Sequence, residues 1–316
     1  MQEQIKRSDM PAKNYYKYLI SAAMFIALLI AVDFIVGAIL KKLYKNQQSG
    51  WDYRTRYSAE ETKAATLIFG SSRAQQQYNP LYIEDSLNTT CYNVGRDGMQ
   101  VPYHYAMLQA VLSRYTPKMI VLDCEYGMFK VADAGYERLS NLLPLYKDHP
   151  EMRPVLNLRS PFEKYKLLSN IYPYNSMIFK LLAGNFSKGK EHEDIKGYRV
   201  LTGKLTHPIK TYDLTNKYPL DTIKIKLFND FINDCRSKNI KLYFVCPPYY
   251  MKIIGIDHSL DVVKKIAAEK NIPFIDYAND SVFQTNPALF DDTVHINYEG
   301  SKIFSAKLAH QLKQIQ

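Results

Sequence analysis

The sequence predicts an α/β domain built around a parallel sheet and preceded by one membrane-spanning helix. Beyond residue 65, short apolar runs alternate with segments whose apolar residues recur at helical spacing. This alternation is typical of β-α-β units, in which right-handed crossovers place helices on both faces of a parallel sheet. Ahead of that region, residues 18–40 form a run of roughly 23 residues, long enough to cross a bilayer. Three later loops gather Ser, Gly, Asp and His where predicted strands end.

The run 18–40 is too long for the apolar core of a usual signal peptide, and no small-residue cleavage site follows it. We therefore expect a cytoplasmic segment 1–17, a transmembrane anchor 18–40, and a polar stalk 41–64. The rest of the chain would then lie outside the cytoplasm, in the periplasm or the extracellular space. Asp33 interrupts the run, and it either meets another membrane protein or is a tolerated acid that snorkels or is protonated.

Five apolar runs are the predicted strands of the domain 65–316, and each is short enough for a buried strand. They are residues 66–70, 91–95, 118–125, 240–248 and 272–277, with helices expected over 101–115, 221–239, 259–271 and 298–314. In sheets of this kind the reactive groups collect in the crevice at the carboxyl ends of the strands. Candidate catalytic residues should therefore follow strands and not precede them.

Residues from about 130 to 220 break the alternation and form a predicted insertion rich in Pro and Tyr. A segment this long within a domain carries its own structure or its own function. One interpretation is a helical insertion packed on the core. The other is a lid or substrate platform whose exposed Tyr rings stack on sugars.

Composition excludes several other classes of protein. The net charge of +10 is spread along the chain with no basic block and no nucleic-acid-binding motif, so no nucleic-acid partner is expected. The cysteines, Cys91, Cys124, Cys235 and Cys246, have no metal-ligand spacing, and we expect buried free thiols and no metal. Neither a dinucleotide fingerprint nor a phosphate-binding loop is present, and no cofactor is expected.

The candidate catalytic residues follow the first, second and fifth predicted strands. "FGSSRA" (69–74) places a Ser at a strand-to-helix turn, and a Ser needs a base to become a useful nucleophile. In "DDTVHINYEG" (291–300), His295 supplies a base that titrates near neutral pH. Asp292, three residues earlier, would fix the imidazole tautomer, and Asp291 competes for that role. Asn297 is the expected N-cap of the last helix.

Glycines and one arginine complete the set of candidates. Gly95 and Gly98 in "NVGRDG" (93–98) would let backbone N–H groups face the crevice and stabilise an oxyanion, or they serve a tight turn. Arg73 either binds an anionic substrate or forms a structural ion pair. Arg73, Gly95 and Asp291 are therefore predicted substrate-binding candidates.

These three blocks together resemble the SGNH, or GDSL-like, hydrolase superfamily over about residues 66–128 and 240–312. The resemblance implies a three-layer α/β/α, flavodoxin-like fold and acyl-ester hydrolysis or transfer through a covalent Ser intermediate. It assigns the nucleophile to Ser72, the orienter and base to Asp292 and His295, and the oxyanion donors to Ser72 and Gly98. The family's third block carries an Asn after the third strand, and this chain reads "CEYGM" there.

The architecture is similar to that of membrane-anchored relatives that acylate envelope polymers, such as alginate acetylation proteins and D-alanyl transfer proteins of teichoic acid systems. That similarity implies an acylated cell-envelope polysaccharide as substrate and a membrane-bound acyltransferase as partner. Our first hypothesis is thus a membrane-anchored serine esterase or O-acyltransferase. The alternatives are a non-catalytic glycan-binding or assembly subunit of a membrane acyltransferase complex, which Asp33 and the missing Asn favour, and a lipid esterase that uses the same site.

Overall fold

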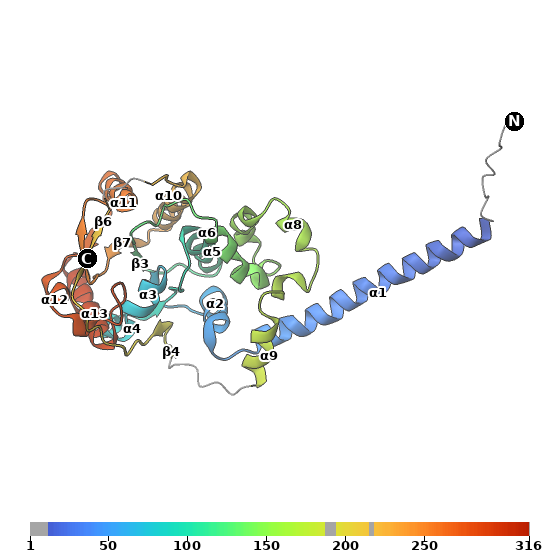
Figure 1. Cartoon of the computed structure of the whole chain (residues 1–316), viewed down its shortest axis with the longest axis horizontal. Coiled ribbons are helices and arrows are strands. Elements are labelled where there is room, and N and C mark those ends of the chain that lie inside the picture. The colour runs from blue at the N-terminus through green and yellow to red at the C-terminus, as the bar shows by residue number, and fades with distance from the viewer. Residues whose placement is uncertain (1–11, 187–193, 215–217, 316) are drawn as a thin grey trace.

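The computed structural model describes residues 12–186, 194–214 and 218–315. A helix α1 (Ala12–Lys45) projects from a folded domain that contains the rest of the described chain (Figure 1). Its segment Tyr15–Lys45 is the one helix in the described residues that is long and apolar enough to cross a membrane. The side chains from Tyr15 to Val32 are all exposed.

The domain is organised around a parallel five-stranded sheet, as predicted. Its strands in spatial order are β2 (Cys91–Asn93), β1 (Thr66–Phe69), β3 (Met119–Asp123), β7 (Lys241–Cys246) and β9 (Phe274–Asp276). Each lies within one of the five predicted runs. This order, 2-1-3-4-5 among the sheet's own strands, is the flavodoxin-like one, in which ligands bind where the chain switches direction between the first and third strands.

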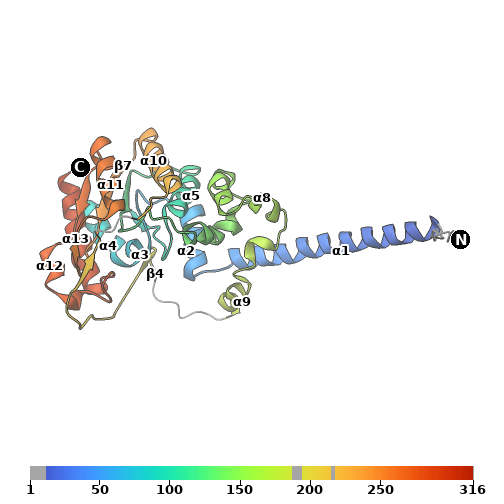
Figure 2. The same ribbon diagram turned by 45° about the horizontal axis from the view of Figure 1, so that its top comes forward.

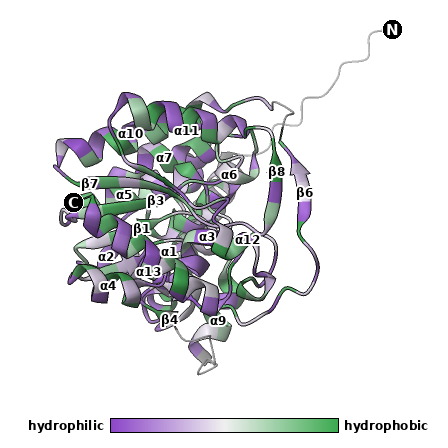
Figure 3. Cartoon of the chain, turned by 90° about the vertical axis from the view of Figure 1, so that its left-hand side faces the viewer, coloured by the Kyte–Doolittle hydropathy of each residue, from purple (hydrophilic) through white to green (hydrophobic). Residues whose placement is uncertain are grey.

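Helices cover both faces of the sheet, because alternate residues of each strand point to opposite sides. Leu67 and Phe69 belong to one apolar cluster and Ile68 to the other. The first cluster packs under α5 (Val101–Leu112), α10 (Thr222–Ser237) and α11 (His258–Glu269), and the second under α3 (Ser72–Gln77), α4 (Pro80–Leu87) and α13 (Tyr298–Gln314). Figure 3 shows α10 and α11 on one side of the apolar strands and α4 and α13 on the other. The three-layer α/β/α prediction is therefore confirmed.

The predicted stalk is wrong, because residues 41–64 are folded onto the domain. They contain the last turn of α1 and a second helix, α2 (Gly50–Glu60), which packs against α5. Asp52 is buried and pairs with Arg96 at 3.3 Å, and Ala59 is fully buried. The polar composition that suggested a stalk instead supplies these buried hydrogen-bonding groups.

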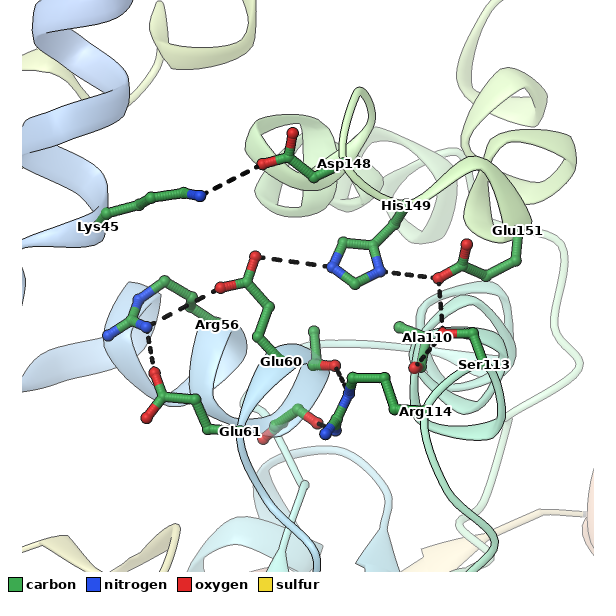
Figure 4. A network of polar contacts seen from close by, with 12 residues as sticks. Lys45, Arg56, Glu60, Glu61, Ala110, Ser113, Arg114, Asp148, His149 and Glu151 are labelled. Atoms are coloured by element: carbon green, nitrogen blue, oxygen red, sulfur yellow. Dashed lines mark hydrogen bonds and ion pairs between the residues drawn. The ribbon is translucent and has the colours of Figure 1, made fainter.

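A polar network joins the end of α1, α2, α5 and the insertion (Figure 4). His149 lies between two carboxylates, with Nδ1 at 2.7 Å from Glu151 and Nε2 at 3.6 Å from Glu60. The Glu60 carboxylate raises the pKa of His149, against the opposing effect of burial, and Glu151 adds to the rise. Lys45 lies 3.6 Å from Asp148 in the same network. The end of α1 is therefore fixed to the domain by ion pairs as well as by packing.

The insertion is mainly helical and packs on the domain, as one of the two interpretations predicted. Its described elements are α6 (Ala134–Glu137), the 3₁₀ turns η1 (Arg138–Leu145), η2 (Pro150–Met152), η3 (Asn157–Arg159) and η4 (Tyr172–Tyr174), the helices α7 (Arg153–Leu156), α8 (Glu163–Lys166) and α9 (Ile178–Phe186), and the strands β4 (Asp194–Ile195), β5 (Tyr198–Arg199) and β6 (Lys210–Asp213). β6 pairs with β8 (Met251–Ile254), which follows β7. The remaining elements, α12 (Ser281–Gln284) and η5 (Pro287–Leu289), precede the His295 loop. Tyr174 and Tyr198 are buried, and Tyr165 and Tyr212 are exposed.

Asp33 meets the insertion and not an unshielded lipid surface. Its carboxylate accepts hydrogen bonds from Ser169 Oγ, from the backbone N–H and Nδ2 of Asn170 at 2.7 and 2.8 Å, and from the backbone N–H of Ile171 at 3.3 Å. Gly37, one turn later, touches the same loop so closely that a Cβ there would lie 2.3 Å from Asn170 Cβ. The acid within the predicted span is thus satisfied by backbone and side-chain donors of this chain, an alternative that neither earlier interpretation contained.

Candidate active site

Ser72 is presented by a sharp turn between β1 and α3. β1 ends at Phe69, Gly70 adopts φ +152°, and Ser72 is the first residue of α3. A Cβ at Gly70 would lie 2.5 Å from Asp123 Cβ and 2.7 Å from Ala74 Cβ. Only Gly therefore fits this turn, for conformational and for steric reasons. The turn lifts the partly exposed Ser72 to the carboxyl edge of the sheet, at the switch point beside β3.

The structure brings Ser72, His295 and Asp292 together in one chain of hydrogen bonds. His295 Nε2 lies 2.8 Å from Ser72 Oγ, and His295 Nδ1 lies 2.8 Å from Asp292 Oδ2. The other oxygen of Asp292 accepts the backbone N–H groups of Val294 at 2.7 Å and His295 at 2.9 Å. Burial raises the pKa of Asp292, but the hydrogen bonds from His295 and Val294 outweigh it and the pKa is lowered. Asp292 thus stays ionised and can orient the imidazole.

The His295 loop is fastened to the rest of the site from several sides. Asn297 caps α13 by accepting the Gly300 N–H at 3.1 Å, as predicted, and its Nδ2 donates to Gly203 O at 2.9 Å. Gln77 of α3 donates to Val294 O at 2.6 Å, which ties the loop to the helix that carries Ser72. These bonds hold base and nucleophile in register without help from a ligand.

Asp291 and Gly203 form a second contact of this loop. Asp291 Oδ1 accepts the Gly203 N–H at 2.6 Å, so the end of the insertion lies against the catalytic loop. Asp291 does not pair with His295 through its side chain in any of the hydrogen bonds of the described residues. The choice of Asp292 as orienter agrees with this geometry, and a substrate-binding role for Asp291 stays a prediction.

The glycines after β2 divide into two roles. Gly95 donates its N–H to Asn93 Oδ1 at 2.9 Å, and a Cβ there would lie 2.7 Å from Ala74 Cβ, so Gly95 serves close packing against α3. Gly98 has φ +70° and lies against the guanidinium of Arg138, an insertion residue. The loop between them is joined to the nucleophile turn by Arg96 N–H, which donates to Gly70 O at 3.1 Å. The oxyanion role of Gly98 stays a prediction.

Arg73 is buried beneath the nucleophile and does not reach a substrate surface. Its side chain is 1% exposed, and Nη2 lies 3.2 Å from Asp123 Oδ1 and 2.9 Å from Cys124 O. The guanidinium lies 4.3 Å from the ring centre of Tyr249. The structure favours the ion-pair interpretation of Arg73 over direct contact with substrate.

Cys124 and the other three cysteines are buried free thiols, as predicted.

Glu125 lies where the third block of the SGNH pattern would carry its Asn, directly after β3. It accepts the Ser71 hydroxyl at 2.6 Å, beside the nucleophile. Burial raises the pKa of Glu125, and Arg73 opposes the rise.

Tyr249, which follows β7 in the run "PPYY", was not among the predicted site residues. Its position after a strand of the sheet was the signal that could have found it.

Known proteins were compared with the chain by sequence and by structure. No protein-family model and no curated protein matches the sequence. Among solved structures, a protein assigned to the lipolytic G-D-S-L family from Desulfitobacterium hafniense DCB-2 matches with TM-score 0.39 and 10% identity, covering 78% of this chain and 98% of that one. A protein described as an acylhydrolase from Bacteroides fragilis NCTC 9343 matches with TM-score 0.39 and 14% identity over 84% and 99%. The acetyl xylan esterase AlAXEase matches with TM-score 0.37 and 15% identity over 79% and 98%.

The fold is assigned from the order of the strands in the sheet and from the positions of the candidate residues, and the assignment does not depend on those overall similarities. A parallel sheet in flavodoxin-like order carries Ser72 after its first strand and the D-x-x-H loop after its last, as the sequence resemblance implied. The chain therefore has a three-layer α/β/α fold around a parallel sheet in flavodoxin-like order, as its resemblance to the SGNH hydrolase superfamily implied.

Proposed function

We propose that this protein is a membrane-anchored serine esterase or O-acyltransferase. The observation that carries the proposal is the continuous pair of 2.8 Å hydrogen bonds from Ser72 through His295 to Asp292. A hydroxyl, an imidazole and an ionised carboxylate in this order activate a serine nucleophile. The proposed anchor is α1, whose side chains from Tyr15 to Val32 are exposed on all sides of the helix.

The proposed reaction proceeds through an acyl-enzyme. His295 Nε2 accepts the Ser72 proton while Ser72 Oγ attacks the ester carbonyl carbon, and the carbonyl oxygen becomes an oxyanion. The backbone N–H groups of Ser72 and Gly98 are the proposed donors to that oxyanion. When the ester bond breaks, His295 returns the proton to the departing alkoxide. Water then completes hydrolysis, or an acceptor hydroxyl completes transfer, by the same steps in reverse.

An acylated cell-envelope polysaccharide is the proposed substrate, with a membrane-bound acyltransferase as partner. The support is the combination of anchor and SGNH site in one chain. The exposed ring of Tyr165 and the partly exposed ring of Tyr212 offer stacking surfaces in the insertion, though other Tyr residues of that segment are packed inside. The proposed location is the cell membrane, with the domain on the extracytoplasmic side.

A fluorophosphonate probe tests the proposal on the full-length chain. It should label Ser72, and the label should be lost in Ser72→Ala and strongly reduced in His295→Ala. Ser71→Ala is the matched control, because Ser71 is the neighbouring hydroxyl and contacts Glu125 instead of the imidazole. We expect that variant to retain the label.

Turnover of an activated acetyl ester completes the test, and it should vanish in Ser72→Ala. Undiminished turnover in that variant would remove Ser72 from the mechanism. Failure of the probe to label the wild type under any condition would favour the non-catalytic binding subunit instead. Turnover of phospholipid esters in preference to acetylated glycans would favour the lipid esterase.

A further inference from the structure

Large apolar side chains lie exposed along one part of the insertion. Phe179 is 86% exposed and Leu168 is 76% exposed, the highest values among the large apolar residues of the described chain. Together with neighbours from the same stretch they form what we term the apolar collar: Leu158, Phe162, Tyr165, Leu168, Phe179 and Leu182. Isolated apolar residues on a surface need no explanation, but a concentration of them marks an interaction surface.

The apolar collar lies on the side of the domain from which α1 projects. Leu168 directly precedes Ser169 and Asn170, which bind Asp33 of α1. α9, which carries Phe179, contacts α1, and Asn185 at its end donates to Leu43 O at 2.9 Å. Both views of the ribbon place α8 and α9 on the side of the domain from which α1 projects (Figures 1 and 2).

The collar lies at the height where the hydrocarbon core of a bilayer would end. The eighteen residue steps from Tyr15 to Asp33 correspond to about 27 Å at about 1.5 Å per residue, close to the roughly 30 Å of a hydrocarbon core. Tyr15 marks the opposite end, where interfacial Tyr residues are expected. Protein contacts to α1 begin at Asp33 on the face toward the insertion, where Leu40 and Tyr44 are buried, whereas Phe34, Ile35 and Ile39 remain exposed on the other side of the helix. If α1 spans a bilayer from Tyr15 onward, the side chains around the Asp33 level would lie near the end of the hydrocarbon core.

Basic residues accompany the apolar ones. Lys164, Lys166 and Lys180 are exposed and lie within the same stretch of sequence. Lys164 Nζ lies 4.9 Å from the ring centre of Tyr165, so a cation and an aromatic ring are presented together. Apolar and aromatic side chains flanked by lysines are the composition of elements that rest in the interface of a bilayer with anionic lipids.

We propose that the apolar collar is a second membrane-contact surface, which inserts Phe179 and Leu168 among the lipids of the leaflet next to the domain. The occupant is an anionic lipid surface, continuous with the lipid around α1. The collar and α1 together would fix the height and tilt of the domain over the membrane, because Asp33 is hydrogen-bonded to Ser169 and Asn170 beside Leu168, and α9 packs on α1. The proposal rests on α1 as a span and is independent of the esterase activity.

The experiment uses the full-length chain reconstituted in protein-free vesicles of phosphatidylcholine and phosphatidylglycerol. Phe179→Cys and Leu168→Cys each carry an environment-sensitive fluorophore, and the four native cysteines are buried. Ile256→Cys is the matched control, because Ile256 is 73% exposed and lies between β8 and α11, away from α1. Labels at 168 and 179 should show blue-shifted emission, several-fold quenching by brominated lipids and protection from iodide. The label at 256 should show the reverse.

Two results would overturn the proposal. In the first, labels at 168 and 179 respond to iodide and to brominated lipids as the label at 256 does. In the second, they are protected in native membranes but water-exposed in protein-free vesicles, which would assign the collar to a protein partner. Loss of lipid quenching when phosphatidylglycerol is omitted would support the role of the lysines. Because labelling requires no catalysis, failure here is distinguishable from failure of the proposed esterase activity.

Discussion

Replacement of Arg73 by Met tests whether this arginine supports the site or binds substrate. Met keeps much of the apolar stem and removes the guanidinium. Asp123, fully buried at its side chain, would then lose its ion pair and keep the Tyr78 hydroxyl at 3.0 Å as a hydrogen-bond donor. Tyr249 would lose the cation that lies over its ring. We therefore expect a large loss of stability.

The magnitude follows from the burial of both partners. Breaking a buried ion pair by removing one side costs about 3–5 kcal/mol, because the other charge is left uncompensated. Burial already raises the pKa of Asp123 and Arg73 opposes that rise, so the variant should protonate Asp123 more readily and relieve part of the cost. The lower limit, about 3 kcal/mol, corresponds to a fall in Tm of roughly 6–12 °C for a domain of this size. The penalty should shrink as pH falls, because removal of the guanidinium raises the folded-state pKa of Asp123 above its value in the wild type, so the variant takes up that proton first.

The assay is thermal unfolding of the detergent-solubilised full-length chain in a double-mutant cycle. Arg73→Met and Asp123→Leu should each destabilise, and the double variant should be more stable than Arg73→Met, since no buried charge remains unpaired. In parallel, kcat/KM should fall by similar factors for neutral and anionic acyl esters. An unchanged Tm, together with a raised KM for anionic esters alone, would refute the structural interpretation and return Arg73 to substrate binding.

Three further changes have defined outcomes. Asp292→Asn should lower ester turnover by about 10³–10⁴-fold with little change in Tm, since the imidazole loses its orienting charge; a loss under tenfold would contradict this. Gly70→Ala should destabilise by more than about 3 kcal/mol, from strain plus steric overlap, whereas Gly127→Ala, at φ +73° with open space around its Cβ position, should cost only about 1 kcal/mol in the same thermal assay; equal losses would contradict the steric argument. His149, whose pKa is raised by the Glu60 carboxylate, should stabilise the chain relative to His149→Gln below about pH 6.5 and lose that advantage as pH rises through its folded-state pKa; a pH-independent difference in urea unfolding would contradict it.

The sheet could be predicted because each strand is a short apolar run with both faces covered. A strand buried on both faces is a short, continuous apolar run, whereas the apolar residues of an amphipathic helix recur every three or four positions. Segments with that helical spacing separate the runs. α4 was missed although its start signal is present: Asn79 accepts the Leu81 N–H at 3.1 Å and Pro80 occupies the first turn. α2 was missed for a different reason, since its buried face is polar and its partners, such as Arg96, lie far along the chain.

The candidate site likewise contains residues whose roles could be predicted from the sequence and residues whose roles could not. The three-residue offset between Asp292 and His295 is local, so sequence alone could select the pair, and the topology of a parallel sheet then places Ser72 beside it. The role of Arg73 could not be predicted from the sequence, because an arginine can serve either in a buried ion pair or in an anion-binding site. The structure separates the two interpretations, because it places Asp123, the last residue of β3, against the guanidinium of Arg73, which follows β1.

The hydrogen-bond partners of Asp33 could not be predicted from the types of residue in the sequence. A carboxylate within an apolar run has a cost that depends on its surroundings, and both sequence interpretations looked for those surroundings outside the chain. The partners are instead backbone and side-chain donors at residues 169–171, more than a hundred positions away, in a loop whose sequence contains no cation. Because peptide N–H groups are present at nearly every position, no sequence pattern marks them as ligands. The same contact brings Leu168 beside α1, so one hydrogen-bonded acid connects α1, the insertion and the proposed membrane surface.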